Sequence, residues 1–149
     1  MSTDDFPADN YQVTEQIGHL LRKAYQRHTA IFQQNACDAQ LTSIQFVTLC
    51  ALQDHGPSSQ AELIKATAVD QATIRGIVER LKARGLVALS PDPDDRRKVI
   101  VELTSTGQAL LTEMIPCAQQ ISELTMGSLN PGERIAILYL LRKMNDNND

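Results

Sequence analysis

The sequence predicts a mainly helical chain with one small β-hairpin, an α+β architecture. Three observations predict it. Apolar residues recur at the helical spacing i, i+3, i+4 and i+7 over most of the 149 residues. Helix-capping residues stand just before several of these stretches. The segment 87–103 is different, because two short apolar runs flank a loop with two prolines, the pattern of a hairpin.

The first half of the chain begins with a long helix. Helical periodicity runs from about Tyr11 to Gln34, and residues 35–41 form a linker. The segment Thr42–Gln45 is a capping box, in which the Thr side chain and the Gln side chain bond each other's backbone amides. It opens a second helix, which stops at Gly56 and the proline that follows.

Two further helices follow at close spacing. A second capping box, Ser59–Glu62, opens a short helix that ends near residue 66. Residues 67–69 are too few for another element and form a turn, and Asp70 is a favourable N-cap for the next helix. Gly85 ends that helix after two basic residues. Its apolar face consists of Ile74, Ile77, Val78 and Leu81.

The opposite face of this helix carries groups suited to reading DNA bases. It comprises Gln71, Thr73, Arg75, Gly76 and Arg80. A Gln can form two hydrogen bonds with adenine, an Arg can do so with guanine, and a Thr methyl can contact thymine. The glycine would let the helix backbone approach a sugar-phosphate edge closely. An ordinary solvated face, with both arginines paired to acidic neighbours, is the alternative.

The hairpin ends in a basic tip. Strands are expected at 87–89 and 99–103, and the loop between them ends in Arg96, Arg97 and Lys98. Such a tip fits a DNA minor groove, where narrow A·T-rich segments attract arginine. Asp95 is close enough to hold the Arg97 guanidinium by a paired hydrogen bond. A solvated charged loop is the alternative.

Together, residues 42–104 have the order of a winged helix-turn-helix, a DNA-binding unit. Ser58 and Ser59, at the start of its short helix, complete the predicted DNA contacts. The predicted set is thus Ser58, Ser59, Gln71, Thr73, Arg75, Gly76, Arg80, Asp95, Arg96, Arg97 and Lys98.

The C-terminal third predicts a dimer. A helix from about residue 106 to 127 contains Pro116, which should kink it. The segment Asn130–Glu133 opens a last helix that is apolar nearly all round. A small monomer has no second wall to bury such a surface, so we expect a two-fold partner. The dimer would use helices at about 11–35 and 106–144, within a single domain spanning 1–149. Burial in the chain's own core is the alternative.

The sequence resembles the MarR family of winged helix-turn-helix transcriptional regulators. The residues that carry the resemblance are the runs 71–81, 84–87, 92–98 and 101–104, and Gly107. The D-x-x-D-x-R pattern that ends at Arg97, followed by a strand and Leu-Thr, is the wing of this family. The resemblance implies that Arg97 enters the minor groove and that Asp95 orients it. The family often has a basic or hydroxyl residue in place of Gly76, which implies an unusual base-reading code.

The resemblance also implies a function. We expect a dimeric repressor of a catabolic or resistance operon, released from a pseudo-palindromic operator by a small aromatic carboxylate or phenol. The ligand would lie between the dimer helices and the winged unit. Candidates on the first helix are His19, Arg22, Tyr25 and Gln26, of which Arg22 or His19 could pair a carboxylate. The alternative is that these side chains are solvated or packed.

Composition sets the remaining expectations. A net charge of −4 argues at first against nucleic acid, but residues 71–91 carry four cations and one carboxylate. No apolar run approaches the ~20 residues that span a bilayer, and Met1–Asp5 lacks a secretory pattern, so we expect a cytoplasmic protein without membrane contact. No spacing of motif residues indicates a catalytic, metal or cofactor site.

The cysteines leave one alternative open. Cys37, Cys50 and Cys117 are odd in number and lack paired spacing, which predicts free thiols in a reducing compartment. Cys37, in the linker, is the one expected to be exposed, so a redox-responsive regulator is a second reading. A winged-helix module that binds protein rather than DNA is a third.

Overall fold

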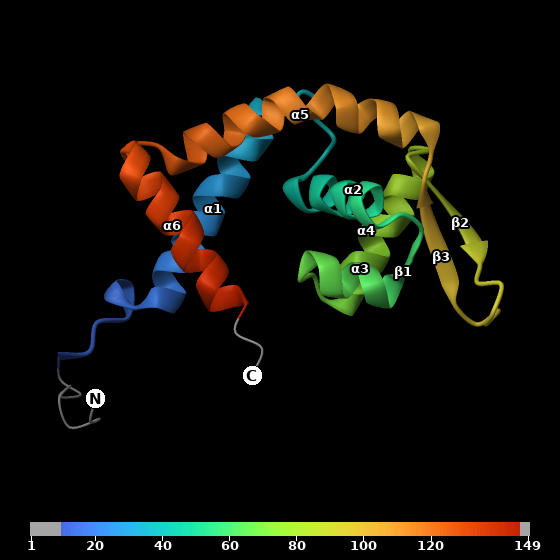
Figure 1. Cartoon of the computed structure of the whole chain (residues 1–149), viewed down its shortest axis with the longest axis horizontal. Coiled ribbons are helices and arrows are strands. Elements are labelled where there is room, and N and C mark those ends of the chain that lie inside the picture. The colour runs from blue at the N-terminus through green and yellow to red at the C-terminus, as the bar shows by residue number, and fades with distance from the viewer. Residues whose placement is uncertain (1–9, 147–149) are drawn as a thin grey trace.

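The computed structural model describes residues 10–146, so the expectation for Met1–Asp5 lies outside the described residues. Figure 1 shows an arch in which the long helix α5 joins a helical arm to a compact lobe. The arm consists of α1 and α6, and the lobe holds α2, α3, α4 and the sheet. The elements are a 3₁₀ turn Val13–Glu15, α1 Ile17–Asn35, α2 Ser43–His55, β1 Ser58–Ser59, α3 Gln60–Thr67, α4 Gln71–Ala83, β2 Val87–Pro91, β3 Val99–Leu103, α5 Ser105–Met126 and α6 Pro131–Asn145.

The predicted mainly helical fold with a wing is confirmed, and the capping signals mark the helix starts. Full capping boxes open α2, α3 and α6. Two details differ from expectation. The first long helix begins only at Ile17, after a separate 3₁₀ turn. A third strand, β1, pairs antiparallel with β3, giving the strand order β1-β3-β2.

The core of the lobe is shared with the first half of α5. It contains Leu49, Leu63, Ile74 and Val101 from the winged unit, all fully buried. Leu111 and Met114 of α5 are equally buried and belong to the same cluster. Burial of this apolar area supplies the main favourable term in folding. The start of α5 is therefore fixed to the winged unit rather than to the arm.

The junction between the wing and α5 explains the roles of Gly85, Thr104 and Gly107. The Thr104 hydroxyl donates to the Gly85 carbonyl at 2.6 Å and accepts the Gly107 amide at 3.1 Å, which caps α5. A Cβ at Gly107 would overlap the Leu86 carbonyl oxygen. This position therefore requires a glycine, because the helix backbone lies directly against the segment that follows α4.

The arm is held to α5 by polar contacts. Arg27 donates to the carbonyls of Leu124 at 2.8 Å and Thr125 at 3.2 Å, near the end of α5. These carbonyls have no helical partner, so the guanidinium satisfies them. α5 continues through Pro116 as one helix and follows a bowed course (Figure 1).

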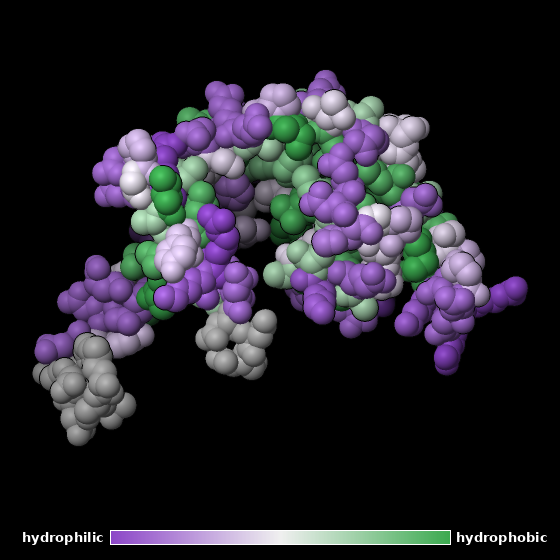
Figure 2. All heavy atoms as spheres, in the orientation of Figure 1, coloured by the Kyte–Doolittle hydropathy of each residue, from purple (hydrophilic) through white to green (hydrophobic). Residues whose placement is uncertain are grey.

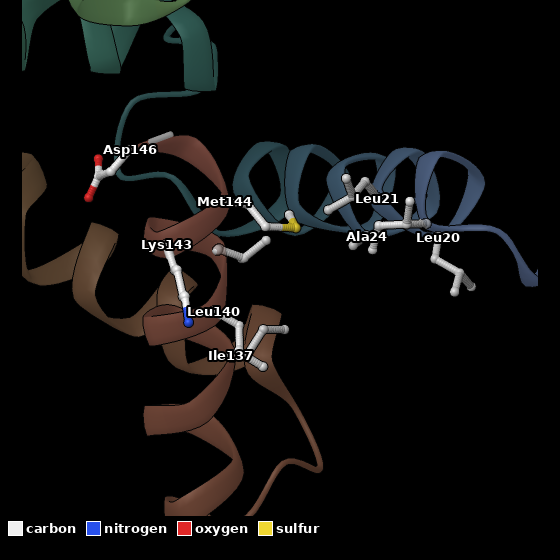
Figure 3. A pocket seen from close by; sticks show the side chains of 10 residues that line it. Leu20, Leu21, Ala24, Ile137, Leu140, Lys143, Met144 and Asp146 are labelled. Carbon is white, nitrogen blue, oxygen red and sulfur yellow. The ribbon is translucent and has the colours of Figure 1, made fainter. Parts of the chain in front are cut away.

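The arm leaves a large apolar surface uncovered. α6 buries no residue within the single chain, and Ile135 is 71% exposed. Figure 2 shows apolar side chains on the arm and hydrophilic ones at the tip of the wing. A groove of about 930 Å³ separates α1 from α6, and Figure 3 shows its apolar side chains directed toward one another. Those labelled there include Leu20, Leu21, Ala24, Ile137, Leu140 and Met144.

The cysteine prediction is wrong for two residues. Cys37 and Cys117 are joined by a disulfide, with Cα atoms 6.2 Å apart, and only Cys50 is free. The two residues are 80 positions apart, so no local spacing could reveal the pair. Among the residues the structure describes, no helix is long and apolar enough to cross a membrane.

Candidate nucleic-acid interface and adjoining pocket

α4 presents the predicted base-reading residues to solvent. Its apolar face is buried, which fixes the rotation of the helix about its axis. Gln71, Arg75, Gly76 and Arg80 are exposed on the other side. Within residues 10–146, neither arginine forms an ion pair. The alternative of a neutralised face is therefore not what the structure contains, and both guanidinium groups are available for a partner.

Gly76 has no structural role that requires glycine. A Cβ built there meets nothing within 4 Å, and its φ is not positive. A helix-interior glycine costs about 1 kcal/mol relative to alanine. The chain carries this cost on the exposed face of α4, at the centre of the predicted interface.

The first turn of α4 is fixed by its cap. The Asp70 carboxylate accepts the Thr73 amide at 2.8 Å and the Thr73 hydroxyl at 2.9 Å. The hydrogen bond from the Thr73 amide is the main cause of the lowered pKa of Asp70. Because the hydroxyl is occupied, Thr73 has mainly its methyl group to offer a base.

The last turn of α4 is fixed by an ion pair that sequence analysis missed. Arg84, at the C-cap, donates to the Asp38 carboxylate at 2.6 Å. This hydrogen bond is the largest cause of the lowered pKa of Asp38. Asp38 belongs to the linker between α1 and α2, so the linker contacts the end of α4 directly.

The wing carries an exposed arginine that is held by a neighbouring carboxylate. Asp95 accepts the Arg97 backbone amide at 3.1 Å and the Arg97 Nε at 3.2 Å, both through Oδ1. The prediction that Asp95 contacts Arg97 is thus met by one guanidinium bond and one backbone bond, not by a paired bond to the guanidinium. The Arg97 side chain is 92% exposed, and that of Asp95 is 31% exposed. The carboxylate therefore orients the arginine without covering it.

Ser58 is a correction to the predicted DNA contacts. It is 3% exposed, lies in β1, and its hydroxyl donates to the Gly56 carbonyl at 2.8 Å. The side chain faces the core because β1 pairs with β3, so we remove it from the predicted set. Ser59 instead caps α3, and its hydroxyl exchanges hydrogen bonds with Glu62.

A pocket of about 470 Å³ lies between α1 and the winged lobe. Its walls come from α1, from α2 and from the segment that joins α3 to α4. The lining residues are Tyr25, His28, Ser43, Ile44, Val47, Thr67, Ala68, Val69, Asp70 and Thr73. Asp70 and Thr73 are also the cap of α4. One wall of the pocket is therefore the first turn of the base-reading helix.

Only one of the four predicted ligand residues reaches this pocket. Tyr25 lines it, whereas His19, Arg22 and Gln26 do not. The winged lobe faces the turn of α1 that follows Tyr25, and His28 on that turn lines the pocket. Ile44 is a wall of the pocket as well as a neighbour of the core.

His28 takes the place that sequence analysis gave to Arg22. It lies three residues after Tyr25, so its placement on the same side of α1 follows from helical spacing. Its Nδ1 is 2.9 Å from the Thr125 hydroxyl, and burial lowers the pKa of its imidazole. Burial therefore favours the neutral imidazole. Among residues 10–146, no lysine or arginine lines the pocket.

Comparison with known proteins decides the family. A sequence model described as the MarR family matches residues 39–98, which include α2, α3, α4 and most of the wing. The transcriptional repressor NicR of Pseudomonas putida is 83% identical over 145 residues, covering 96% of this chain and 92% of NicR. The chain belongs to the MarR family. It is a transcriptional regulator, as the resemblance implied.

Solved structures of MarR-family proteins extend the match to the whole arch. BpsR of Bordetella bronchiseptica, whose DNA binding is regulated by 6-hydroxynicotinic acid, is 60% identical with a TM-score of 0.85. The alignment covers 91% of this chain and 98% of that one. A mutant MarR of Escherichia coli in complex with operator DNA has 26% identity and a TM-score of 0.77, covering 90% and 99%. This MarR-family chain therefore shares both its winged lobe and its arm with proteins that bind operators or respond to ligands.

Proposed function

We propose that this MarR-family regulator is a dimeric repressor of a catabolic or resistance operon, whose hold on its operator is released by a small hydroxylated aromatic acid. The observation that carries the proposal is the double role of Asp70 and Thr73, which cap α4 and line the pocket. A ligand in the pocket contacts the base-reading helix at its first turn. Ligand binding and DNA binding are thereby coupled through a single structural element.

On DNA, α4 would lie in the major groove and the wing in the minor groove. Gln71, Arg75 and Arg80 are free to contact base edges or phosphates, and the Thr73 methyl can touch thymine. Gly76 lets the helix backbone come close. In the wing, Asp95 aims Arg97, with Arg96 and Lys98 beside it. Ser59, at the start of α3, would contribute a phosphate contact.

The dimer would form through the arms. The exposed apolar faces of α1 and α6 are continuous across their groove, and a second copy supplies the matching surface. Two copies of α4 about 34 Å apart would reach successive major grooves, which predicts a pseudo-palindromic operator. The protein would act in the cytoplasm, where its operator lies, as a single-domain regulator without catalytic activity.

The pocket favours a single aromatic ring with a hydrogen-bonding edge. Ile44, Val47 and Val69 provide apolar walls, while Tyr25, His28 and Ser43 provide polar groups. This mixture is typical of small-molecule sites. The regulation of BpsR by 6-hydroxynicotinic acid, at 60% identity to this chain, supports a ligand of that class. His28 would meet the ligand's carboxylate, since among the described residues that line the pocket it is the only one that can become cationic.

A titration tests the proposal. A duplex from the region upstream of the regulator's own gene is bound in fluorescence anisotropy, and 6-hydroxynicotinic acid is then added. We expect release by the acid and no release by nicotinamide, which lacks the carboxylate. Val47→Trp, at a partly exposed position in the pocket wall, should retain DNA binding and lose the response. Equal release of the wild type and this variant would remove the pocket from the mechanism.

A further inference from the structure

Two cysteines flank the winged lobe in the sequence and lie side by side in the structure. Cys37 is exposed in the linker between α1 and α2, and Cys117 is half-buried near the middle of α5. The 80-residue separation between them encloses every element from α2 to β3. Their Cα distance of 6.2 Å falls in the range that a disulfide requires without backbone movement.

The position of this pair in the fold is specific. The described chain passes between the arm and the winged lobe twice, once through the linker 36–42 and once along α5 (Figure 1). Cys117 lies on α5 between two fixed points. Met114, before it, packs in the lobe, and Thr125, after it, contacts His28 of the arm. The bond from Cys37 to Cys117 therefore joins the two passages to each other.

We propose that Cys37 and Cys117 are a reversible thiol–disulfide site, oxidised by hydroperoxides, whose closure weakens the coupling between the effector pocket and DNA. The pocket lies between α1 of the arm and the first turn of α4 in the lobe, and a covalent link across both passages restrains any adjustment of the lobe against the arm when the effector binds. The chemistry of the site is independent of the proposed function. Only its consequence for DNA binding rests on that function.

The reaction balances with one peroxide per disulfide. The exposed Cys37 thiolate attacks a peroxide oxygen, the O–O bond breaks, and hydroxide leaves and is protonated to water. The resulting sulfenic acid is attacked by the Cys117 thiolate, so that an S–S bond forms, the S–O bond breaks and a second water leaves. Two thiols are oxidised and one hydrogen peroxide is reduced. A dithiol reductant reverses the bond by exchange and is itself oxidised to a disulfide.

The bond also lies next to the base-reading helix. Asp38 follows Cys37 directly and accepts the 2.6 Å hydrogen bond from Arg84 at the end of α4. When the disulfide is closed, the linker residue that holds this end of α4 is anchored to α5. The first turn of α4 faces the effector and the last turn faces the cysteine pair, so the two inputs act on opposite ends of one helix.

Peptide mapping tests the site itself. The full-length protein is treated with hydrogen peroxide or with a dithiol, digested without reduction and analysed by mass spectrometry. We expect a Cys37–Cys117 linked peptide after peroxide, lost after dithiol, in the wild type and in Cys50→Ala. Oxidation should also raise the Tm of these two proteins but not of Cys37→Ser or Cys117→Ser, because the link restricts the unfolded chain. Absence of the linked peptide, or an unchanged Tm, overturns the site.

The effector response tests the consequence. The ratio of operator Kd with and without 6-hydroxynicotinic acid is measured for reduced and oxidised protein on the duplex described above. We expect the ratio to fall by roughly threefold or more on oxidation in the wild type and to stay constant in both serine variants. A full response in cross-linked protein overturns the coupling. If reduced protein gives no response at all, the proposed function fails. The cysteine site is then decided by the linked peptide and the Tm alone.

Discussion

The Asp70 carboxylate accepts both the amide and the hydroxyl of Thr73, at 2.8 and 2.9 Å, and both residues line the pocket beside α1. This cap determines where α4 begins and how its first turn is oriented. A ligand that displaces either side chain changes the start of the helix and hence the position of Arg75 one turn later. Regulation then needs only a small movement at the cap, since the buried face of α4 transmits it as a rigid element.

Removal of the wing arginine should weaken DNA binding without affecting the fold. Arg97→Ala should raise the operator Kd by about fivefold or more, corresponding to about 1–3 kcal/mol, because the exposed guanidinium is lost. The Tm should not change, since the side chain is almost fully exposed. Asp95→Ala should give a smaller loss, because the arginine remains but is no longer oriented. Anisotropy titrations at several salt concentrations measure both, and equal affinity of wild type and Arg97→Ala would exclude the wing from the interface.

Gly76→Ala should change stability and affinity in opposite directions. The added methyl meets nothing within the chain, so the free energy of unfolding should rise by up to about 1 kcal/mol. Operator affinity should fall, because the methyl occupies the space between the α4 backbone and DNA. Urea unfolding and anisotropy measure the two effects. An alanine variant that is more stable and binds as tightly as the wild type would show that DNA does not approach this residue.

A charge in the arm groove should separate the subunits. Leu140→Glu places a carboxylate among apolar side chains that are exposed in the single chain, so the fold of each subunit should survive. The dimer should dissociate, because burying an unpaired charge at the interface is costly. Light scattering after gel filtration measures the mass, and operator affinity should fall in parallel. Gln119→Glu, which adds the same charge at an exposed position of α5, is the matched control and should remain dimeric.

Effector binding should depend on the protonation of His28. Burial lowers the pKa of His28 in the free protein, so its ring is neutral at pH 7. A bound carboxylate favours the charged ring and raises that pKa, while Asp70 across the pocket disfavours the anionic ligand. Binding therefore takes up a proton. Affinity should be highest below the pKa of His28 in the free protein, should fall as the pH rises from that value through the pKa of the complex, and should level off above it.

Calorimetry in two buffers of different ionisation enthalpy measures this proton uptake directly. His28→Gln keeps a hydrogen-bonding side chain of similar length but cannot be protonated. It should show weaker binding and a flat pH profile between pH 5 and 8 (the range in which an ordinary histidine titrates). Retention of the wild-type pH dependence in this variant would assign the proton to another group.

The sequence was sufficient for the helices, the wing and the exposed face of α4, because these depend on local chemistry. The residues Thr42, Ser59, Asp70 and Asn130 each cap a helix in the structure, as their type and position predict. The contact between Asp95 and Arg97 was also local, since they are two positions apart in the sequence. The last helix is apolar on nearly all sides, which indicated that a single chain would leave part of it uncovered.

The remaining features depend on distant parts of the chain. The strand β1 has two residues and exists only because β3 lies beside it. The pairing of Asp38 with Arg84 spans 46 residues, and the Cys37–Cys117 bond spans 80. The position of the pocket along α1 depends on distant parts of the chain as well. Periodicity gives the side of α1 on which a residue lies, but not which turn of the helix the winged lobe approaches.

The uncovered surface of α6 has a consequence for the amount of protein in the cell. No residue of α6 is buried in a single chain, so much of its stability comes from assembly and varies with concentration. On dilution, this helix should lose its structure before the winged lobe does. A regulator made in few copies would then exist partly as half-folded single chains, which proteases remove. The number of operators that it can occupy would follow the square of its synthesis rate rather than the rate itself.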